Sequence, residues 1–234
     1  VLHKAINGSE SLMEELIGKS NGEHISKALK GSMDGLYKRV EMARKNIRSG
    51  VDTGLHDLNK ITNGWQPGNL VIIAARPSMG KTAVMLHLAK SAAKSNTPVA
   101  IFSLEMSDIS LANRLILSEC DVDPERFKSG YMTNEEINKV ETAVNELWRL
   151  PIYVDDNPCV TMDYIRSRCK ILKKQGKCGI IMADYLQLAE SGEREGSRER
   201  EVAKMSRTAK ITAKELKVPF LLLSQLNRGN EARP

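Results

Sequence analysis

Aromatic residues, cysteine and histidine are scarce in this sequence, and each scarcity limits what the protein can be. Phe, Trp and Tyr make up only 4% of a chain that is 41% hydrophobic, so a core must be built mainly from Leu, Ile, Val, Ala and Met. The cysteines have neither metal-ligand spacing nor the pattern of a short secreted disulfide framework, and the scattered histidines suggest no metal site. Reduced cysteines in a cytosolic protein are therefore expected. The residues concerned are Cys120, Cys159, Cys169 and Cys178, and His3, His24, His56 and His87.

Long apolar runs are absent as well. No stretch is apolar for long enough to cross a bilayer, and the N-terminal residues do not have the pattern of a signal peptide. The net charge is +6, from 35 basic and 29 acidic residues. This mild basic excess is compatible with a nucleic-acid partner but does not by itself indicate one. We expect a cytoplasmic protein without membrane association.

Residues 70–82, LVIIAARPSMGKT, predict a phosphate-binding loop. A short apolar run ends at Ala75, a tight turn follows, and a helical pattern begins at Lys81. In this strand–turn–helix context, backbone N–H groups of the turn form a nest for phosphate oxygens, and the first turn of the helix adds further donors. The usual pattern begins with glycine, where this sequence has Ala75. Gly80, where the backbone must approach a phosphate closely, is present.

The loop supplies the first set of candidate site residues. Lys81 is long enough to reach the β- and γ-phosphates, and the hydroxyl of Thr82 suits Mg²⁺. A chance Gly-Lys-Thr at a helix start is the alternative, and the strand before it and the helix after it argue against that alternative. The predicted nucleotide-binding residues of the loop are Ser78, Met79, Gly80, Lys81 and Thr82.

The sequence before residue 51 predicts a separate region. Residues 1–22 are a short mixed segment, and residues 23–50 contain a long helix with an apolar stripe. Two glycines inside that helix weaken it by about 1 kcal/mol each relative to alanine, so it needs a surface to pack on. It either covers its own domain or docks on a neighbouring subunit, and the sequence leaves both open. The stripe consists of Ile25, Leu29, Met33, Leu36, Tyr37 and Val40.

From residue 51 to residue 234, predicted strands and helices alternate. The strands are near-continuous apolar runs, which is typical of a mostly parallel sheet covered by helices on both faces, and we assign the chain to the α/β class. Residues 49–54, SGVDTG, are interpreted as a flexible stretch at a domain boundary. Residues 190–200, ESGEREGSRER, contain no apolar residue and are interpreted as an exposed loop.

Polar side chains follow three of the predicted strands. Asp184 comes directly after the run IIMA, Glu105 follows the run from Pro98 to Leu104, and Gln225 follows the run from Val218 to Leu223. Ligands of doubly wound sheets bind at the carboxyl ends of the strands. A carboxylate at the end of a buried strand needs a partner, so we predict that Asp184 lies in a Mg²⁺ shell. The alternative for Asp184 and Glu105 is an ordinary helix-capping or salt-bridged acid.

Taken together, these motifs resemble the motor domain of DnaB-type hexameric replicative DNA helicases, within the RecA-like ATPases. The resemblance covers residues 51–228 and extends to residues 23–48. Several motifs in the right order are far more specific than one. The matching stretches are TGLHDLNKITNGWQPGNL at 53–70, AARPSMGKT at 74–82, IFSLEMS at 101–107, DYLQL at 184–188 and LSQLNR at 223–228.

The resemblance implies roles for individual residues. Glu105 would be the general base that polarises the attacking water, and Gln225 would couple the γ-phosphate to the DNA-binding side. Arg114 would approach the phosphates, although a surface salt bridge is an alternative for it. The segment 190–200 matches a loop that faces the central channel of the ring, and a solvated loop without a DNA contact is the alternative. Its DNA-binding candidates are Arg194, Arg198 and Arg200.

The resemblance also implies an organisation and a function. Residues 23–50 would be a linker helix region that packs on the adjacent protomer, residues 1–22 the tail of an N-terminal domain, and residues 51–234 a motor domain lacking the family's arginine finger and second DNA loop. The expected activity is 5′-to-3′ DNA unwinding driven by ATP and Mg²⁺, by a hexameric ring on single-stranded DNA in a bacterial or phage-infected cell. Primase and a helicase loader are the implied partners.

Three rival functions are compatible with the same residues. Another RecA-like ATPase, a recombinase or a repair ATPase, would share the nucleotide site but form filaments. A non-catalytic ring that uses ATP only to assemble is a rival of another class. A metabolic kinase is disfavoured, because no residues of a small-substrate pocket are evident.

Overall fold

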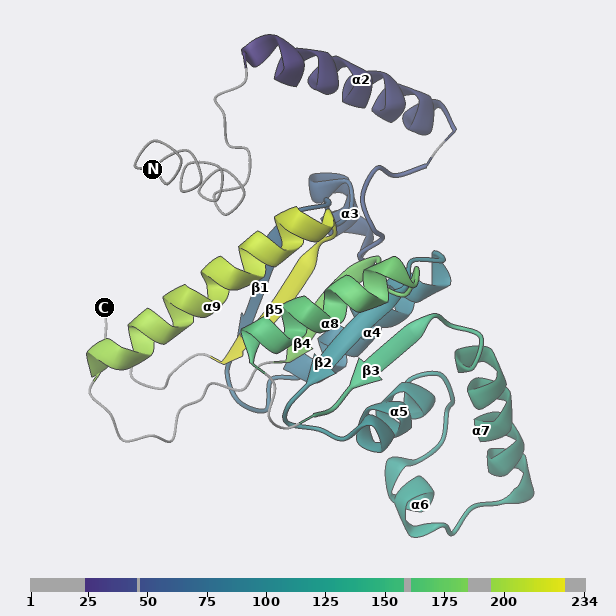
Figure 1. Cartoon of the computed structure of the whole chain (residues 1–234). Coiled ribbons are helices and arrows are strands. Elements are labelled where there is room, and N and C mark those ends of the chain that lie inside the picture. The colour runs from purple at the N-terminus through teal and green to yellow at the C-terminus, as the bar shows by residue number, and fades with distance from the viewer. Residues whose placement is uncertain (1–23, 46, 158–160, 185–194, 226–234) are drawn as a thin grey trace, which may run out of the picture. The chain divides into compact units, whose positions relative to one another are not determined.

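The structure is a computed structural model that describes residues 24–45, 47–157, 161–184 and 195–225. The chain divides into two compact units, Val1–Ile47 and Arg48–Pro234. The first unit contains helix α2 (Ile25–Arg44), and the second contains the other described elements (Figure 1).

Helix α2 carries the expected apolar stripe but buries none of its own residues. Ile25 is 63% exposed, and the other members of the stripe are between 41% and 66% exposed. The helix contains five lysine and arginine residues against two acidic ones. Among the described residues of its own unit, nothing covers this apolar face, and the helix carries a positive excess of charge.

The second unit is built on a parallel sheet, which confirms the predicted fold class. In the described part of the chain the sheet has five strands in the order β1-β5-β4-β2-β3, and every neighbouring pair is parallel. The strands are β1 (Leu70–Ala75), β2 (Val99–Ser103), β3 (Ile152–Asp155), β4 (Ile180–Asp184) and β5 (Phe220–Gln225).

Helices cover both faces of this sheet (Figure 1). Helices α8 and α9 pack on one face and α4 on the other, while α5, α6 and α7 gather beside β3. None of the described helices combines the length and the apolar character needed to cross a bilayer. The helices are α3 (His56–Thr62), α4 (Lys81–Lys94), α5 (Asp108–Leu117), α6 (Pro124–Ser129), α7 (Asn134–Leu147), α8 (Met162–Lys174) and α9 (Glu195–Leu216).

Alternation along the central strands divides the core into two layers. Successive side chains of a strand point to opposite faces. In β2, Ala100 and Phe102 therefore join the layer under α8 and α9, while Val99 and Ile101 join the layer under α4 and α5. Strands β4 and β5 divide in the same way. Every residue of β2 and β4 is buried, which explains why their sequences are continuous apolar runs. Trp65 is 6% exposed and packs in the second layer.

Side-chain caps set the starts of several helices. Thr133 and Glu136 form a reciprocal capping box at the start of α7, and Thr161 caps α8. Asp123 caps α6, with proline at the first helical position. Each cap satisfies backbone N–H groups that have no partner within the helix.

Two expectations from the sequence are wrong. Of the segment 190–200, residues 195–200 belong to the first turns of α9 and not to a loop, while residues 190–194 lie outside the described residues. Extending a packed helix needs no new nucleation, so a run of glutamate and arginine is helical without any apolar residue. The segment 49–54 is tied down: Val51 pairs with Trp65 in an antiparallel bridge, and Thr53 is fully buried. A Cβ at Gly50 would lie 2.6 Å from the backbone of Gly64, so glycine serves a close approach there and not flexibility.

Candidate active site

Four strands end together at one edge of the sheet. Ala75 at the end of β1 is in register with Gln225 at the end of β5. Asp184 at the end of β4 is in register with Ser103 of β2 on one side and Leu223 of β5 on the other. The polar residues predicted at strand ends therefore lie at the same edge, which is where ligands of such sheets bind.

The loop between β1 and α4 contains two residues with positive φ. Ser78 has a φ of 63° and Gly80 a φ of 82°. A Cβ built on Gly80 would meet nothing within 4 Å, so its backbone conformation and not crowding calls for glycine. Backbone that turns through left-handed residues can direct successive N–H groups to one side as an anion nest. For Ser78, a residue other than glycine, this conformation is strained. Such strain is common at functional sites, where the surrounding structure holds the backbone in place.

An ion pair and a hydrogen bond join this loop to β4. Lys81 Nζ lies 3.0 Å from Asp184 Oδ1, and Thr82 Oγ1 donates a hydrogen bond of 2.8 Å to Asp184 Oδ2. The side chain of Asp184 is 1% exposed and that of Lys81 10% exposed. Asp184 Oδ1 accepts no hydrogen bond of regular geometry from the described residues, although Lys81 Nζ lies within ion-pair distance of it. One buried carboxylate oxygen thus keeps capacity for another ligand.

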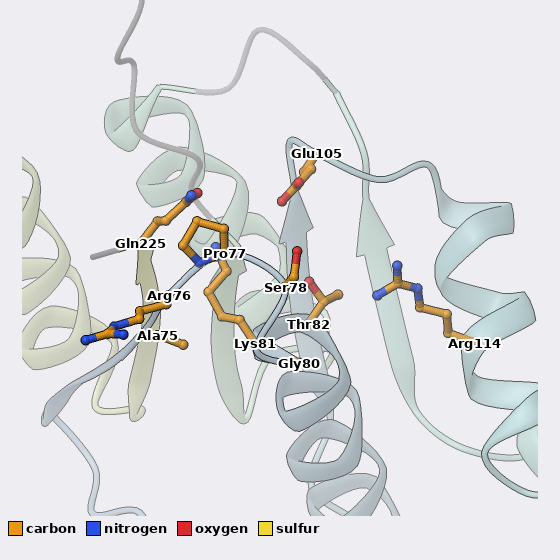
Figure 2. Close-up of a pocket in the computed structure, with 10 residues that line it drawn as sticks. All are labelled: Ala75, Arg76, Pro77, Ser78, Gly80, Lys81, Thr82, Glu105, Arg114 and Gln225. Carbon is orange, nitrogen blue, oxygen red and sulfur yellow. The ribbon is translucent and has the colours of Figure 1, made fainter. Parts of the chain in front are cut away.

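A cavity of about 470 Å³ opens beside this ion pair (Figure 2). Its lining is mostly polar and combines the phosphate loop with residues distant in sequence. The lining residues are Ala75, Arg76, Pro77, Ser78, Gly80, Lys81, Thr82, Glu105, Arg114 and Gln225.

Three of these residues come from three other elements. Glu105 lies in the turn after β2, Arg114 on α5, and Gln225 at the end of β5. In Figure 2, the Glu105 carboxylate and the Arg114 guanidinium both point toward the space over the phosphate loop, whereas Arg76 points away. Arg114 is exposed and forms no ion pair with any residue in the described ranges. The alternative of a surface salt bridge for Arg114 therefore has no partner there.

Not every predicted residue joins the cavity. Met79 does not line it: the residue is 70% exposed, and its N–H donates to Arg76 O at 3.3 Å. That N–H closes the turn and is not directed to a ligand. Asp184 does not line the cavity either, but it contacts two residues that do, Lys81 and Thr82. Arg194 and the side chain of Arg198 lie outside the described residues, while Arg200 is exposed on α9. Arg200 does not line the cavity.

Sequence reasoning missed the residues that support the site. Arg76 and Pro77 line the cavity, although the predicted nucleotide-binding residues of the loop began only at Ser78. Ser103 was also missed: its hydroxyl donates to Met106 O at 2.8 Å and accepts from Met106 N–H at 3.2 Å. The only signal in the sequence was a hydroxyl residue at the end of an apolar strand, which is too common to single out. No three His, Cys, Asp or Glu side chains gather into a metal-binding group anywhere in the described ranges.

A family model matches most of the chain. Residues 50–234 match the model described as DnaB-like helicase C terminal domain. A curated protein, the replicative DNA helicase DnaB of Geobacillus stearothermophilus, is 41% identical over 201 residues, which are 84% of this chain and 44% of that protein. The DnaB protein of Nostoc is 43% identical over 201 residues, or 84% of this chain and 23% of that protein. The chain thus spans less than half the length of these relatives.

Solved structures agree with this match. A structure described as an ATPase domain superposes with a TM-score of 0.78 at 34% identity, covering 90% of this chain and 74% of that one. A DnaB-like replicative helicase, described with its interactions with primase, superposes with a TM-score of 0.75 at 31% identity and covers 99% of this chain and 59% of its own. The comparisons in sequence and in structure point to the same group of proteins.

Proposed function

Because the chain belongs to the family of DnaB-like helicase C-terminal domains, we propose that it is the ATP-driven motor of a replicative DNA helicase. One observation carries the proposal: Lys81, Glu105, Arg114 and Gln225, from four elements, line one cavity at the carboxyl edge of the sheet. Phosphoryl transfer needs little covalent chemistry from the protein, so catalysis depends on positioned charges and donors of this kind. We assign ATP hydrolysis to this cavity.

The phosphate loop and Asp184 fit a nucleotide with its magnesium ion. Mg²⁺ keeps several waters and usually takes one or two carboxylates together with substrate phosphates. The buried Asp184 carboxylate has an oxygen without a hydrogen bond, and the Thr82 hydroxyl lies 2.8 Å from its other oxygen. Thr82 and Asp184 would therefore hold the ion. When bound, Mg²⁺ neutralises charge on the transferring phosphate group.

The remaining lining residues take distinct roles. Lys81 binds phosphate oxygens, exchanging its contact with Asp184 for one with the nucleotide. Glu105 orients and deprotonates the attacking water. Gln225 lies at the end of a buried strand. By contacting the γ-phosphate, it would shift β5 and the chain beyond it when ATP is bound. Arg114 approaches the phosphates from the side of α5. Backbone donors at Ser78 and Gly80 complete the nest.

The apolar face of α2 supports a ring of subunits. A groove of about 400 Å³ on the second unit is lined by apolar residues of α5, α7 and β3, including Leu111, Leu115, Leu147 and Trp148. Helix α7 contains four glutamates and one lysine, the opposite balance to α2. An amphipathic helix that lays its apolar face in such a groove is a common mode of recognition. We propose that α2 of one copy docks on this groove of a second copy, and that the ring is hexameric.

The ring would encircle single-stranded DNA and move 5′ to 3′. No DNA contact can be assigned from the described residues. The candidates for DNA binding therefore remain Arg194, Arg198 and Arg200. Backbone contacts from such residues would bind without reading sequence and would weaken with salt. Primase is a proposed partner, since a similar helicase was described with its interactions with primase. A helicase loader, and a bacterial or phage-infected cytoplasm as the setting, are proposed on family resemblance.

The test is ATP turnover and fork unwinding by the full-length protein, with and without single-stranded DNA. Lys81→Ala should lower turnover by at least about 10²-fold, the cost of losing one positioned donor, and should abolish unwinding. Lys94→Ala is the matched control, because Lys94 also lies on α4 and forms an ion pair but is 52% exposed and remote from the cavity. Normal hydrolysis by Lys81→Ala would refute the site assignment.

The rival functions give different outcomes. Open filaments in electron micrographs would favour a recombinase or repair ATPase. Unchanged assembly and unwinding by a Glu105→Gln variant would remove the catalytic role of that carboxylate. Assembly with ATP but without ATP turnover or unwinding by the unaltered protein would favour a ring that uses ATP only to assemble.

A further inference from the structure

Nothing in the described part of the chain holds the side chain of Glu105 directly. The residue is exposed and makes no hydrogen bond or ion pair there. Its carboxylate nevertheless points into the cavity (Figure 2). The position of the carboxylate must therefore come from the backbone turn that carries it, and the question is what holds that turn.

The turn after β2 is closed by one hydroxyl group. Ser103 Oγ donates to Met106 O at 2.8 Å and accepts from Met106 N–H at 3.2 Å. These two bonds close a loop around Leu104 and Glu105. Among the described residues, no backbone–backbone hydrogen bond joins one part of segment 103–107 to another. The hydroxyl of Ser103 thus does for this turn what a backbone hydrogen bond does for an ordinary one.

Ser103 is itself rigidly placed. It is the last residue of β2, whose five residues are all buried, and it is 1% exposed. Its register partner is Asp184, the carboxylate that contacts both Lys81 and Thr82. The Ser103 hydroxyl therefore fixes the position of Glu105 relative to the same strand ends that hold the phosphate loop.

The same closure sets the start of α5. Met106 is followed by Ser107, which caps α5 by accepting from Ser110 N–H at 3.3 Å. The N–H of Asp108 donates to Asp156 at 3.1 Å, which ties the start of the helix to the segment after β3. Arg114 lies two turns further along this helix. The segment from Ser103 to Arg114 therefore delivers two cavity residues from one anchored point.

We propose that Ser103 is a positioning residue for Glu105: its hydroxyl locks the turn so that the carboxylate is held toward the attacking water. The proposal rests on the proposed function, since it assigns a role only if Glu105 acts as the base. A displacement of the order of 1 Å at a reacting group can cost up to about 10²-fold in rate. A loosened turn should therefore slow hydrolysis while leaving the phosphate loop, and nucleotide binding, intact.

The experiment uses the full-length protein with single-stranded DNA. Ser103→Ala should lower kcat for ATP hydrolysis about 10- to 100-fold, with KM and the Kd of a fluorescent ADP changed less than about twofold. Ser103→Thr, which keeps the hydroxyl, should restore most of kcat. Ser118→Ala is the matched control: Ser118 Oγ makes the same kind of bond, 2.7 Å to Leu115 O, at the other end of α5. That variant should keep normal kcat.

A double-mutant cycle separates positioning from general support. If Ser103 acts through Glu105, then Ser103→Ala should add nothing to the loss already caused by Glu105→Gln, because residues acting as a unit are non-additive. Multiplicative losses would overturn the proposal, as would loss of nucleotide binding in Ser103→Ala, since either would mean a scaffold role. A normal Ser103→Ala beside an impaired Glu105→Gln would overturn it while leaving the proposed function standing. Normal turnover by Glu105→Gln would instead overturn the base assignment itself.

Discussion

Helix α4 has a lysine–carboxylate ion pair toward each end, and the two pairs differ in a way that separates function from stability. At the start of the helix, Lys81 contacts Asp184, and both side chains are at most 10% exposed. Toward its end, Lys90 contacts Glu119, and these side chains are 14% and 11% exposed. Burial is therefore similar, and burial alone does not tell the two pairs apart.

The difference lies in how far each carboxylate is satisfied. Glu119 contacts Lys90 through one oxygen and Lys94, at 3.1 Å, through the other. Burial acts to raise the pKa of Glu119, but hydrogen bonds from the two lysines outweigh it, and the pKa lies below its usual value. Asp184 has one oxygen without a hydrogen bond and faces a cavity-lining lysine. A saturated pair fastens α4 to the end of α5, whereas an unsaturated pair leaves a place for a ligand.

The largest effect is expected when the unsaturated pair is neutralised. Asp184→Asn should lower Mg²⁺-dependent ATP turnover by about 10²- to 10³-fold, comparable to removing one positioned catalytic group. Its free energy of unfolding should also fall, because removing one partner of a buried ion pair leaves the Lys81 ammonium without its counter-charge, at a cost of up to about 3–5 kcal/mol. Steady-state turnover and urea unfolding on the same preparation test both. A fully active variant would contradict the contrast.

A pair of glycines sharpens the contrast at the backbone. Gly80 and Gly130 have φ values of 82° and 79°, and a Cβ on either would meet nothing within 4 Å. Alanine at either position should therefore cost about 1–2 kcal/mol of backbone strain. Only Gly80→Ala should also weaken nucleotide binding, by at least about tenfold, equivalent to one hydrogen bond to a charged group. Equal nucleotide affinities in the two variants would show that the loop does not bind phosphate through its backbone.

The functional end of α4 was predictable from sequence because its signals are local. An apolar run, a turn with Gly80 and a Lys-Thr at a helix start occupy thirteen consecutive residues, and β1 has the predicted bounds. Asp184 and Glu105 were predicted for the related reason that a carboxylate after a buried strand needs a partner. The lysine and threonine that contact Asp184 were not assigned to it, because they lie 102 or more residues away in sequence.

The structural end was not predictable. Lys90, Lys94 and Glu119 sit in ordinary helical patterns, and only the packing of α4 beside α5 brings them together. Ser103 was invisible for a similar reason, since its hydroxyl acts on backbone three residues away and leaves no pattern of residue types. The helical state of residues 195–200 was missed because it depends on the packed remainder of α9 and not on their own composition.

Neutralising Glu119 should lower the stability of the fold slightly and leave ATP turnover unchanged. Glu119→Gln keeps the shape of the side chain but removes the charge that two lysines share. We expect a loss of about 1 kcal/mol in the free energy of unfolding, discounted for partial solvent screening, with ATP turnover unchanged. Chemical denaturation and a turnover assay measure the two quantities. A drop in turnover of tenfold or more would mean that the far end of α4 influences the phosphate loop, and function and stability would not be separable along this helix.

The smallest expected effect is the pH dependence of the stability that Glu119→Gln loses. The pKa of Glu119 is lowered in the folded state from an ordinary value of 4.5, so the unfolded chain binds the proton more readily. The stabilisation is therefore fully present above about pH 4.5 and is lost as the pH falls through the folded pKa. Glu136 and Glu215 also have lowered pKa values, but they are common to both proteins and cancel in the difference. The gap in unfolding free energy between wild type and Glu119→Gln should thus be constant above about pH 5.5 and should close at lower pH. A gap that stays constant down to about pH 3 would mean that the lysines interact with Glu119 by packing and not by charge.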